Sequence, residues 1–397
     1  MKTVWLVDGI RTPIGKHGGV LSSVRPDELG ALVLRTILEK NKIDPYEVEG
    51  VYFGCANQAG EDNRNIARMS WLLAELPVDV PACTVNRLCG SGLEAICDAA
   101  RSIMVGEGDV YIGGGVESMS RSPWVVPKCE TAFPKNHVLM YDSTIGWRFT
   151  HPKMIQFGHT DSLGMTAENL VEQYNISREE QDKFALLSHQ KAIAAIESES
   201  FRDQIVSVET KKGIVNIDEG PRKDTSLEKL LKLKPSFKEN GTVTAGNSSQ
   251  INDAASAVLL VSEEYGKAHG LQPIAKIIST GVAGVPPRIM GIGPVPATKK
   301  ALERSKLTLK NINLIELNEA FAGQSLAVLR EWKIDPEDPR LNPNGGAIAL
   351  GHPLGATGSI LLTKALHEIK RRADIEFALI SLCIGVGQGI SMIIKKI

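Results

Sequence analysis

Residues 345–358 read Gly345-Gly346-Ala347-Ile348-Ala349-Leu350-Gly351-His352-Pro353-Leu354-Gly355-Ala356-Thr357-Gly358, a glycine-rich turn that holds one histidine. A helical pattern from 360 to 371 and a strand from 377 to 382 follow, and the run ends at Gly385-Val386-Gly387. A second stretch has the same layout: a turn around Cys89, a helical pattern from 93 to 104, a strand from 110 to 112, and then Gly113-Gly114-Gly115. Although strand, turn and helix recur in any parallel sheet, the match predicts one unit used twice.

Elsewhere in the chain, short runs of β-branched residues alternate with helical patterns; for example, the run at 3–7 is followed by a helical pattern at 26–41. This alternation predicts an α/β fold with a largely parallel sheet. The stretch between the units is polar and irregular, with an amphipathic helix from 177 to 200 whose start is marked by Ser177 and Glu180. We therefore expect an N-terminal half at 1–121, completed by about 243–270, an inserted loop domain at 122–242, and a C-terminal half at 271–397.

Length and charge narrow the class of protein. A chain of 397 residues is long enough for two or three packed units and a buried site. A net charge of −1 disfavours nucleic acid or an anionic membrane as a partner, since both require a basic excess. The charged N-terminus does not resemble a signal peptide and no apolar run is long enough to span a bilayer, so we expect a cytoplasmic protein.

The six cysteines are sparse and irregularly spaced, with no paired spacing typical of zinc or an iron–sulfur cluster. We expect free thiols and no metal. Most cysteines in such a protein are small buried hydrophobes, so context must single out a reactive one.

Context singles out Cys89 in Asn86-Arg87-Leu88-Cys89-Gly90-Ser91-Gly92. This thiol lies where a strand ends and a helix begins, near unpaired N–H groups whose dipole is expected to lower its pKa. The alternative is a buried cysteine in a tight turn. His352 occupies the same place in the second unit, and if the units pack about a pseudo-twofold axis, its imidazole can accept the thiol proton.

Two further segments carry polar groups at strand ends. Cys383-Ile384-Gly385-Val386-Gly387-Gln388-Gly389 places a thiol at the end of an apolar strand, where open α/β sheets hold ligands, although a core cysteine is the alternative. Asn318-Glu319-Ala320-Phe321 follows the strand 314–317 and could orient a water or a carbonyl group.

Together and in this order, these four segments resemble the signature blocks of the thiolase family, from Asp8-Gly9-Ile10-Arg11-Thr12-Pro13 to the C-terminus. The resemblance implies a duplicated five-layer α/β fold, with two βαβαβαββ halves, mixed sheets and an inserted loop domain. It also implies that Cys89 is acylated, His352 activates it, Cys383 moves the proton at the acetyl α-carbon, and Asn318 holds a water. The N–H groups of Cys89 and Gly385 would form an oxyanion hole.

Such an enzyme needs no cofactor, but its substrates are coenzyme A thioesters, whose phosphates require local positive charge. The later part of the insertion is basic, with Arg202, Lys211, Lys212, Arg222, Lys223, Lys229, Lys232, Lys234 and Lys238, although a solvated face is the alternative. By resemblance Arg222 lies near the nucleotide, and coenzyme A is contacted by Leu163, Phe237, Ala245, Ser249, Ala320 and Phe321. The family also suggests a homodimer or homotetramer.

Two differences from the family pattern concern the choice of substrate. Acetoacetyl-specific members carry a His-Met pair where this chain has Ser162-Leu163, and Val386 replaces a middle glycine. The blocks 54–65 and 144–149 are instead similar to those of 3-oxoadipyl-CoA thiolases, and Arg148 is a candidate cation for a dicarboxylate tail.

Three alternatives stay open from sequence: an acetoacetyl-CoA thiolase, a condensing ketoacyl synthase, and a catalytically silent thiolase-like lipid-binding protein. A ketoacyl synthase would place a second histidine where Cys383 stands, and the intact set of polar residues disfavours a silent protein.

Overall fold

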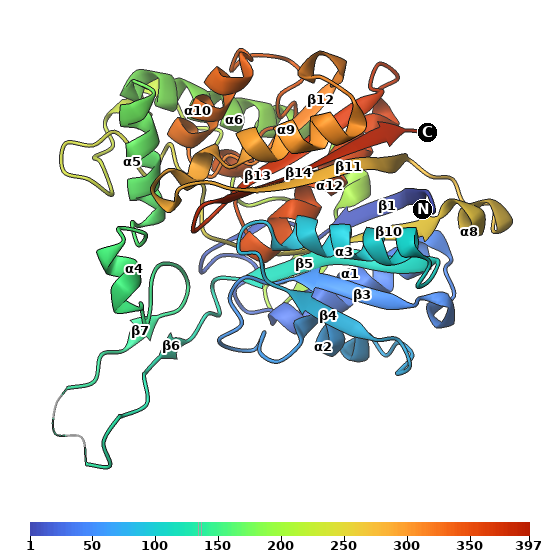
Figure 1. Cartoon of the computed structure of the whole chain (residues 1–397). Helices are drawn as coiled ribbons and strands as arrows, with labels where there is room; N and C mark the ends of the chain where they lie inside the picture. The colour runs from blue at the N-terminus through green and yellow to red at the C-terminus, as the bar shows by residue number, and fades with distance from the viewer. Residues whose placement is uncertain (134, 136) are drawn as a thin grey trace.

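A ten-stranded mixed sheet forms the centre of the computed structural model, which describes residues 1–133, 135 and 137–397 (Figure 1). The strand order is β12-β13-β14-β11-β1-β10-β5-β3-β4, and β2 pairs with β10. In chain order the strands are β1 (Val4–Arg11), β2 (Gly15–Lys16), β3 (Gly50–Gly54), β4 (Ala82–Val85), β5 (Val110–Ser118), β10 (Asn252–Ser262), β11 (Ala275–Gly284), β12 (Leu314–Leu317), β13 (Phe377–Ile384) and β14 (Gln388–Lys396).

The sheet consists of two halves with the same topology. The order β1-β10-β5-β3 in the first half corresponds to β11-β14-β13-β12 in the second, and the pairings in each are antiparallel, antiparallel and parallel. The halves meet where β1 pairs with β11, with Trp5 opposite Lys276. This arrangement confirms the predicted duplication, because unrelated segments have no reason to repeat both order and direction.

The expectation of a largely parallel sheet is wrong. Six of the nine strand pairings are antiparallel and three are parallel. Helical crossovers produce the parallel pairs, but the turn at 385–387 joins β13 directly to β14, and a tight hairpin can only be antiparallel. The strand β10, which follows the long stretch after β5, also runs antiparallel to both neighbours.

Helices cover both sheet halves and fill the space between them, giving five layers (Figure 1). The outer helices α1 (Pro26–Asn41) and α2 (Ile66–Leu73) cover the first half, and α9 (Pro294–Ser305) and α10 (Ala322–Trp332) cover the second. The central layer contains α3 (Ser91–Val105) and α12 (Leu354–Arg371), which pack against each other and share one apolar core. Two short helices, α8 (Glu263–Ala268) and α11 (Ala347–Leu350), complete the halves.

Local sequence explains where the best-predicted helices start. Helix α1 begins at Pro26, where the fixed φ of proline suits the first turn, and ends before Lys42 in a left-handed conformation. In the stretch between β5 and β10, Ser177 accepts the N–H of Glu180 while the Glu180 side chain accepts the N–H of Ser177, so the predicted capping box is present.

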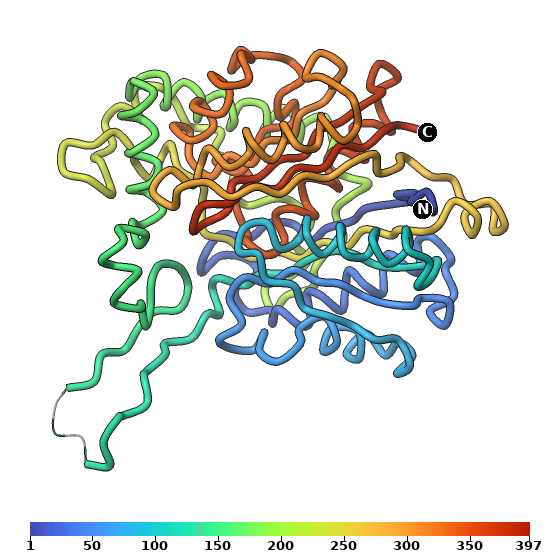
Figure 2. The backbone as a smooth tube through the Cα atoms, in the orientation of Figure 1, coloured from blue at the N-terminus to red at the C-terminus, as the bar shows by residue number. Residues whose placement is uncertain are grey.

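The stretch between β5 and β10 is a mixture of short elements. It contains β6 (Trp124–Val125), β7 (Tyr141–Asp142), α4 (Pro152–Gln156), α5 (Leu163–Gln173), α6 (Arg178–Glu197), β8 (Val208–Thr210), β9 (Gly213–Val215) and α7 (Leu227–Leu231). The backbone tube shows β6 and β7 on an arm that extends away from the layered body (Figure 2). Helices α5 and α6 lie instead against α10 and the rest of the second half.

Candidate active site

The two turns singled out by the sequence precede the two central helices. Cys89 stands two residues before α3, and His352 stands two residues before α12. Cys383 lies near the end of β13, and Asn318 directly follows β12. All four side chains are buried.

A single cavity of about 550 Å³ is bordered by Cys89, His352 and Cys383. The seven residues assigned to coenzyme A by resemblance border the same cavity: Leu163, Arg222, Phe237, Ala245, Ser249, Ala320 and Phe321. The structure therefore brings together residues that are almost three hundred positions apart, as the pseudo-twofold arrangement required.

The other two predicted residues lie directly beside this cavity. The Asn318 side-chain nitrogen lies 3.4 Å from His352 Nε2. Gly385 borders a second cavity of about 220 Å³, which shares Cys89 with the first.

The close approach of α3 to α12 depends on glycine. A Cβ atom on Gly92 would lie 2.7 Å from the Gly355 carbonyl oxygen, and one on Gly358 would lie 2.7 Å from the Leu93 Cβ. Both distances are about 1 Å shorter than a normal contact. These glycines therefore let the two helix starts approach closely enough for Cys89 and His352 to border one cavity.

The predicted low pKa of the Cys89 thiol is wrong. Burial raises the pKa of Cys89 to about 11, although hydrogen bonds from the backbone N–H groups of Gly385 and of Cys89 itself act in the opposite direction. Desolvation of the thiolate thus exceeds the stabilisation expected at a helix start. Near neutral pH the sulfur carries its proton, so it requires a base.

His352 is held in the form that a base requires. Burial lowers the pKa of His352 to about 4, which keeps the imidazole neutral. Thr357 donates its hydroxyl proton to the Pro353 carbonyl, at 2.9 Å, and its oxygen lies 2.7 Å from His352 Nδ1. Because that oxygen has no second proton to donate, it accepts the Nδ1 proton, which leaves Nε2 unprotonated and able to accept a proton.

The two remaining polar groups also suit proton transfer and binding. Burial, together with the nearby Cys89, raises the pKa of Cys383, so this thiol remains protonated and can donate a proton. The Asn318 Oδ1 atom is buried and has no hydrogen-bond partner among the described residues. An unpartnered buried acceptor is costly, which is typical of a group that completes its bonding with water or ligand.

Sequence reasoning missed Glu117, the carboxylate that joins the loops around the site. It accepts the N–H groups of Ala56, Asn57 and Gly355, and it is buried in β5. Burial raises the pKa of Glu117 to about 7. Only the strand register, which is absent from local sequence, could have placed this residue beside the loop of His352.

Two residues in a left-handed backbone conformation border the second cavity together with Cys89. Leu88 has φ of 47° and Val386 has φ of 63°, a left-handed conformation that is rare for a β-branched residue. Val386 is the residue that replaces a glycine of the family pattern. Such strain is typical of functional turns that the surrounding structure holds in place.

The predicted basic surface is only partly at the site. Arg222 and Lys229 border a third cavity of about 190 Å³, which shares Ala245 with the main cavity. His189, missed from sequence, accepts the Arg222 N–H there. By contrast, Lys223, Lys232 and Lys238 pair with glutamates, as expected of a solvated face.

Across the described parts of the chain, every helix is too short or too polar to cross a membrane. All six cysteines are free thiols, as predicted.

Comparisons with known proteins place almost the whole chain in one family. Residues 4–264 match the family model "Thiolase, N-terminal domain" and residues 271–396 match "Thiolase, C-terminal domain". The chain is 52% identical to the 3-oxoadipyl-CoA/3-oxo-5,6-dehydrosuberyl-CoA thiolase of Escherichia coli (strain K12), over 100% of both chains.

Solved structures show the same architecture. The acetyl-CoA acetyltransferase of Bacillus anthracis is 41% identical with a TM-score of 0.93, covering 100% of this chain and 99% of its own. Human mitochondrial 3-ketoacyl-CoA thiolase in complex with CoA is 41% identical with a TM-score of 0.94, covering 100% and 98%.

The chain therefore belongs to the thiolase family, the acyltransferases that cleave 3-oxoacyl-CoA by thiolysis. This membership confirms the predicted family, fold class and enzyme class.

Proposed function

We propose that Cys89 carries the acyl group during thiolysis. Its sulfur attacks the 3-oxo carbon while His352 Nε2 accepts the thiol proton. The bond between the second and third carbons breaks, and its electron pair forms the enolate of acetyl-CoA. Cys383 then donates its proton to the second carbon, which releases acetyl-CoA and leaves an acyl-Cys89 thioester. The observation that carries this proposal is the single cavity shared by Cys89, His352 and Cys383.

The second half of the reaction releases the acyl group. The thiol of free coenzyme A attacks the Cys89 thioester, its proton passes to the deprotonated Cys383, and the sulfur of Cys89 regains the proton held by His352. Both halves develop negative charge on a carbonyl oxygen. In this proposal the N–H groups of Cys89 and Gly385 stabilise one such oxygen, and Nε2 of His352 with a water bound by Asn318 would stabilise the other.

We propose that 3-oxoadipyl-CoA is the preferred substrate, with acetoacetyl-CoA as the alternative. The name of the E. coli relative supports the first, and so does Ser162-Leu163 in place of the His-Met pair of acetoacetyl-specific members. Assaying 3-oxoadipyl-CoA, a longer 3-oxoacyl-CoA and acetoacetyl-CoA side by side tests this choice, and equal or higher kcat/KM for acetoacetyl-CoA would overturn it.

We further propose that 122–242 is a separate coenzyme A-binding insertion between halves at 1–121 with 243–270 and at 271–397. This division is supported by Arg222, which borders both the main cavity and a third cavity that shares Ala245 with it. Coenzyme A would lie in the main cavity against Phe237 and Phe321, whose rings pack edge to face.

We also propose a cytoplasmic homo-oligomer, either a dimer or a tetramer. The arm around β6 and β7 exposes large apolar side chains, including Trp124, Phe133, Leu139 and Phe149. Monomers rarely expose such clusters, and β4 is an uncovered sheet edge that a second copy could extend. Sedimentation measures this directly, and a monomer at micromolar concentration would contradict the proposal.

Two cysteine variants test the assigned roles. Cys89→Ala should abolish thiolysis and covalent labelling by an acyl-CoA. Cys383→Ala should still accept an acyl group on Cys89 but should fail to make or break a carbon–carbon bond, because the acid and base at the α-carbon is missing. Full thiolase activity in Cys89→Ala would refute the proposal.

A further inference from the structure

The second cavity at Cys89 adjoins the main cavity but extends away from most of the residues assigned to coenzyme A. It is bordered by Cys89 and Gly385, and also by Asn57, Trp147 and Arg148. Of the residues assigned to coenzyme A, only Leu163 borders it. A group attached to the Cys89 sulfur can therefore extend into this cavity while coenzyme A occupies the other one.

Arg148 brings an uncompensated positive charge to this cavity. Its guanidinium donates to the Asn57 side-chain oxygen at 2.8 Å and to the Ser143 carbonyl at 3.4 Å, both neutral acceptors. Within the described chain no acidic side chain forms an ion pair with Arg148. The acidic residue at the same cavity, Asp161, is already paired with Arg288 at 3.1 Å.

Asn57 is itself fixed from three sides. Its backbone N–H donates to Glu117 at 3.1 Å, and its side-chain nitrogen donates to Ser122 at 3.2 Å and to the Ser143 carbonyl. With its nitrogen engaged, the amide must turn its oxygen toward Arg148. Asn57 thus orients the guanidinium without neutralising it.

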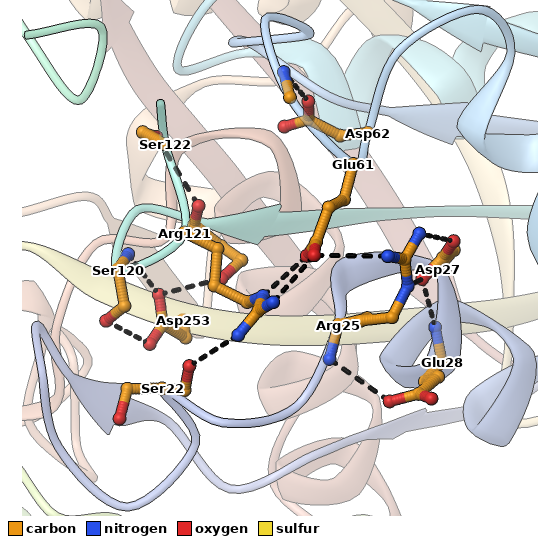
Figure 3. Close-up of polar contacts among 12 residues, drawn as sticks. Ser22, Arg25, Asp27, Glu28, Glu61, Asp62, Ser120, Arg121, Ser122 and Asp253 are labelled. Atoms are coloured by element: carbon orange, nitrogen blue, oxygen red, sulfur yellow. Dashed lines mark hydrogen bonds and ion pairs between the residues drawn. The ribbon is translucent and has the colours of Figure 1, made fainter. Parts of the chain in front are cut away.

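A polar network holds the two segments that carry Asn57 and Ser122 (Figure 3). Glu61, from the loop of Asn57, pairs with Arg121 at 2.5 Å and with Arg25 at 3.1 Å. Ser120 donates its N–H to Asp253 in β10 at 2.8 Å. The support of Arg148 is therefore preorganised, which lowers the entropic cost of binding a ligand.

We propose that Arg148 binds a carboxylate at the far end of the acyl chain, so that this cavity selects dicarboxylic 3-oxoacyl-CoA substrates. In 3-oxoadipyl-CoA two methylene groups separate that carboxylate from the carbon that Cys89 attacks, and Cys89 and Arg148 both border this one cavity of about 220 Å³. The planar guanidinium is the group that pairs best with a carboxylate. This inference rests on the proposed acyl transfer to Cys89 and adds the substrate determinant.

The test compares two substrates of equal chain length, 3-oxoadipyl-CoA and 3-oxohexanoyl-CoA, which differ at the terminal carboxylate. In Arg148→Gln the ratio of their kcat/KM values should fall about a hundredfold, because the substrate carboxylate then enters the cavity without its charged partner. Most of the change should lie in KM for 3-oxoadipyl-CoA. Arg148→Lys should restore part of the ratio, since it keeps the charge but loses the planar fork.

Arg304→Gln is the control, because this exposed arginine donates to the Thr280 carbonyl and borders neither cavity, and it should leave the ratio within about threefold of wild type. An unchanged ratio in Arg148→Gln, or an equal loss with both substrates, would overturn the proposal for Arg148. Retained activity of Cys89→Ala on both substrates would instead overturn the acyl-transfer proposal, so the two failures are distinguishable.

Discussion

Substituting Gly358 by alanine perturbs the site without touching any reacting group. Gly358 lies in α12 where this helix crosses the start of α3. The new Cβ would lie 2.7 Å from the Leu93 Cβ and 3.0 Å from the Leu93 Cα, and closer still to the Leu93 backbone nitrogen. Backbone atoms cannot rotate away, so the helices must separate.

The magnitude follows from these distances. Carbon atoms in contact are normally about 3.5–4.0 Å apart, so the helices must separate by about 1 Å. Overpacking of this kind lowers the free energy of unfolding by about 1–3 kcal/mol. The higher helix propensity of alanine relative to glycine raises it by up to about 1 kcal/mol. We therefore expect a net loss of about 1–2 kcal/mol in the free energy of unfolding.

The effect on catalysis should be larger than the effect on stability. Cys89 and His352 each stand two residues before one of these helices, so a shift of about 1 Å changes their separation and can reduce kcat about a hundredfold. Steady-state thiolysis and urea unfolding measure the two quantities. The control is Gly284→Ala, where the nearest atom lies 3.9 Å away. Unchanged kcat in Gly358→Ala would refute the view that this crossing positions the site.

Three further outcomes follow from the contacts described above. Thr357→Val leaves His352 Nδ1 without its acceptor, so kcat should fall about tenfold to a hundredfold, and Thr357→Ser should recover it. Equal losses in both variants would contradict the view that Thr357 keeps the proton of His352 on Nδ1. Arg222→Gln should raise KM for coenzyme A about threefold to tenfold, and the effect should be weaker at high salt. Lys223→Gln should leave KM unchanged, because Lys223 is already paired with a glutamate. Burial and the neighbouring Arg222 lower the pKa of His189 to about 4, so the unfolded chain binds this proton more readily and His189 lowers stability by up to about 1.4 kcal/mol per pH unit as pH drops from about 6.5 to 4. Urea unfolding of His189→Gln should therefore show a pH dependence shallower than wild type by this amount, and parallel curves would contradict the assignment.

Local pattern was enough to predict most elements and their order. Helix α1 has the bounds that its apolar spacing and Pro26 indicated, and the capping box at Ser177 marks the start of α6. The paired glycine turns also predicted which side chains would meet. These patterns lie in short stretches of sequence or are repeated along it, so they can be recognised without knowledge of tertiary contacts.

Strand direction and strand ends could not be predicted in this way. The predicted strand ends at 112, before the glycines at 113–115, yet these glycines lie inside β5. A Cβ there would meet the backbone of Ile96, Ser256 or Gly355. Glycine is required here by a close approach from another part of the chain. From one sequence, a glycine required by a turn cannot be distinguished from a glycine required by the close approach of another segment.

The electrostatics of the site also depended on tertiary burial. The start of α3 was expected to lower the pKa of Cys89, but the second half of the chain covers this thiol and raises its pKa to about 11. Similarly, the link from Glu117 and Asn57 to Arg148 joins three segments that are far apart in sequence. No spacing rule relates them.

The most direct measurement identifies the residue that carries the acyl group. The enzyme is mixed briefly with acetyl-CoA, quenched in acid, digested and mapped by mass spectrometry, with the exposed Cys83 and Cys129 as internal controls. We expect the acetyl group on Cys89, and we expect its loss on adding coenzyme A before the quench. Acetylation of any other residue in place of Cys89, or a label that coenzyme A does not remove, would contradict the account.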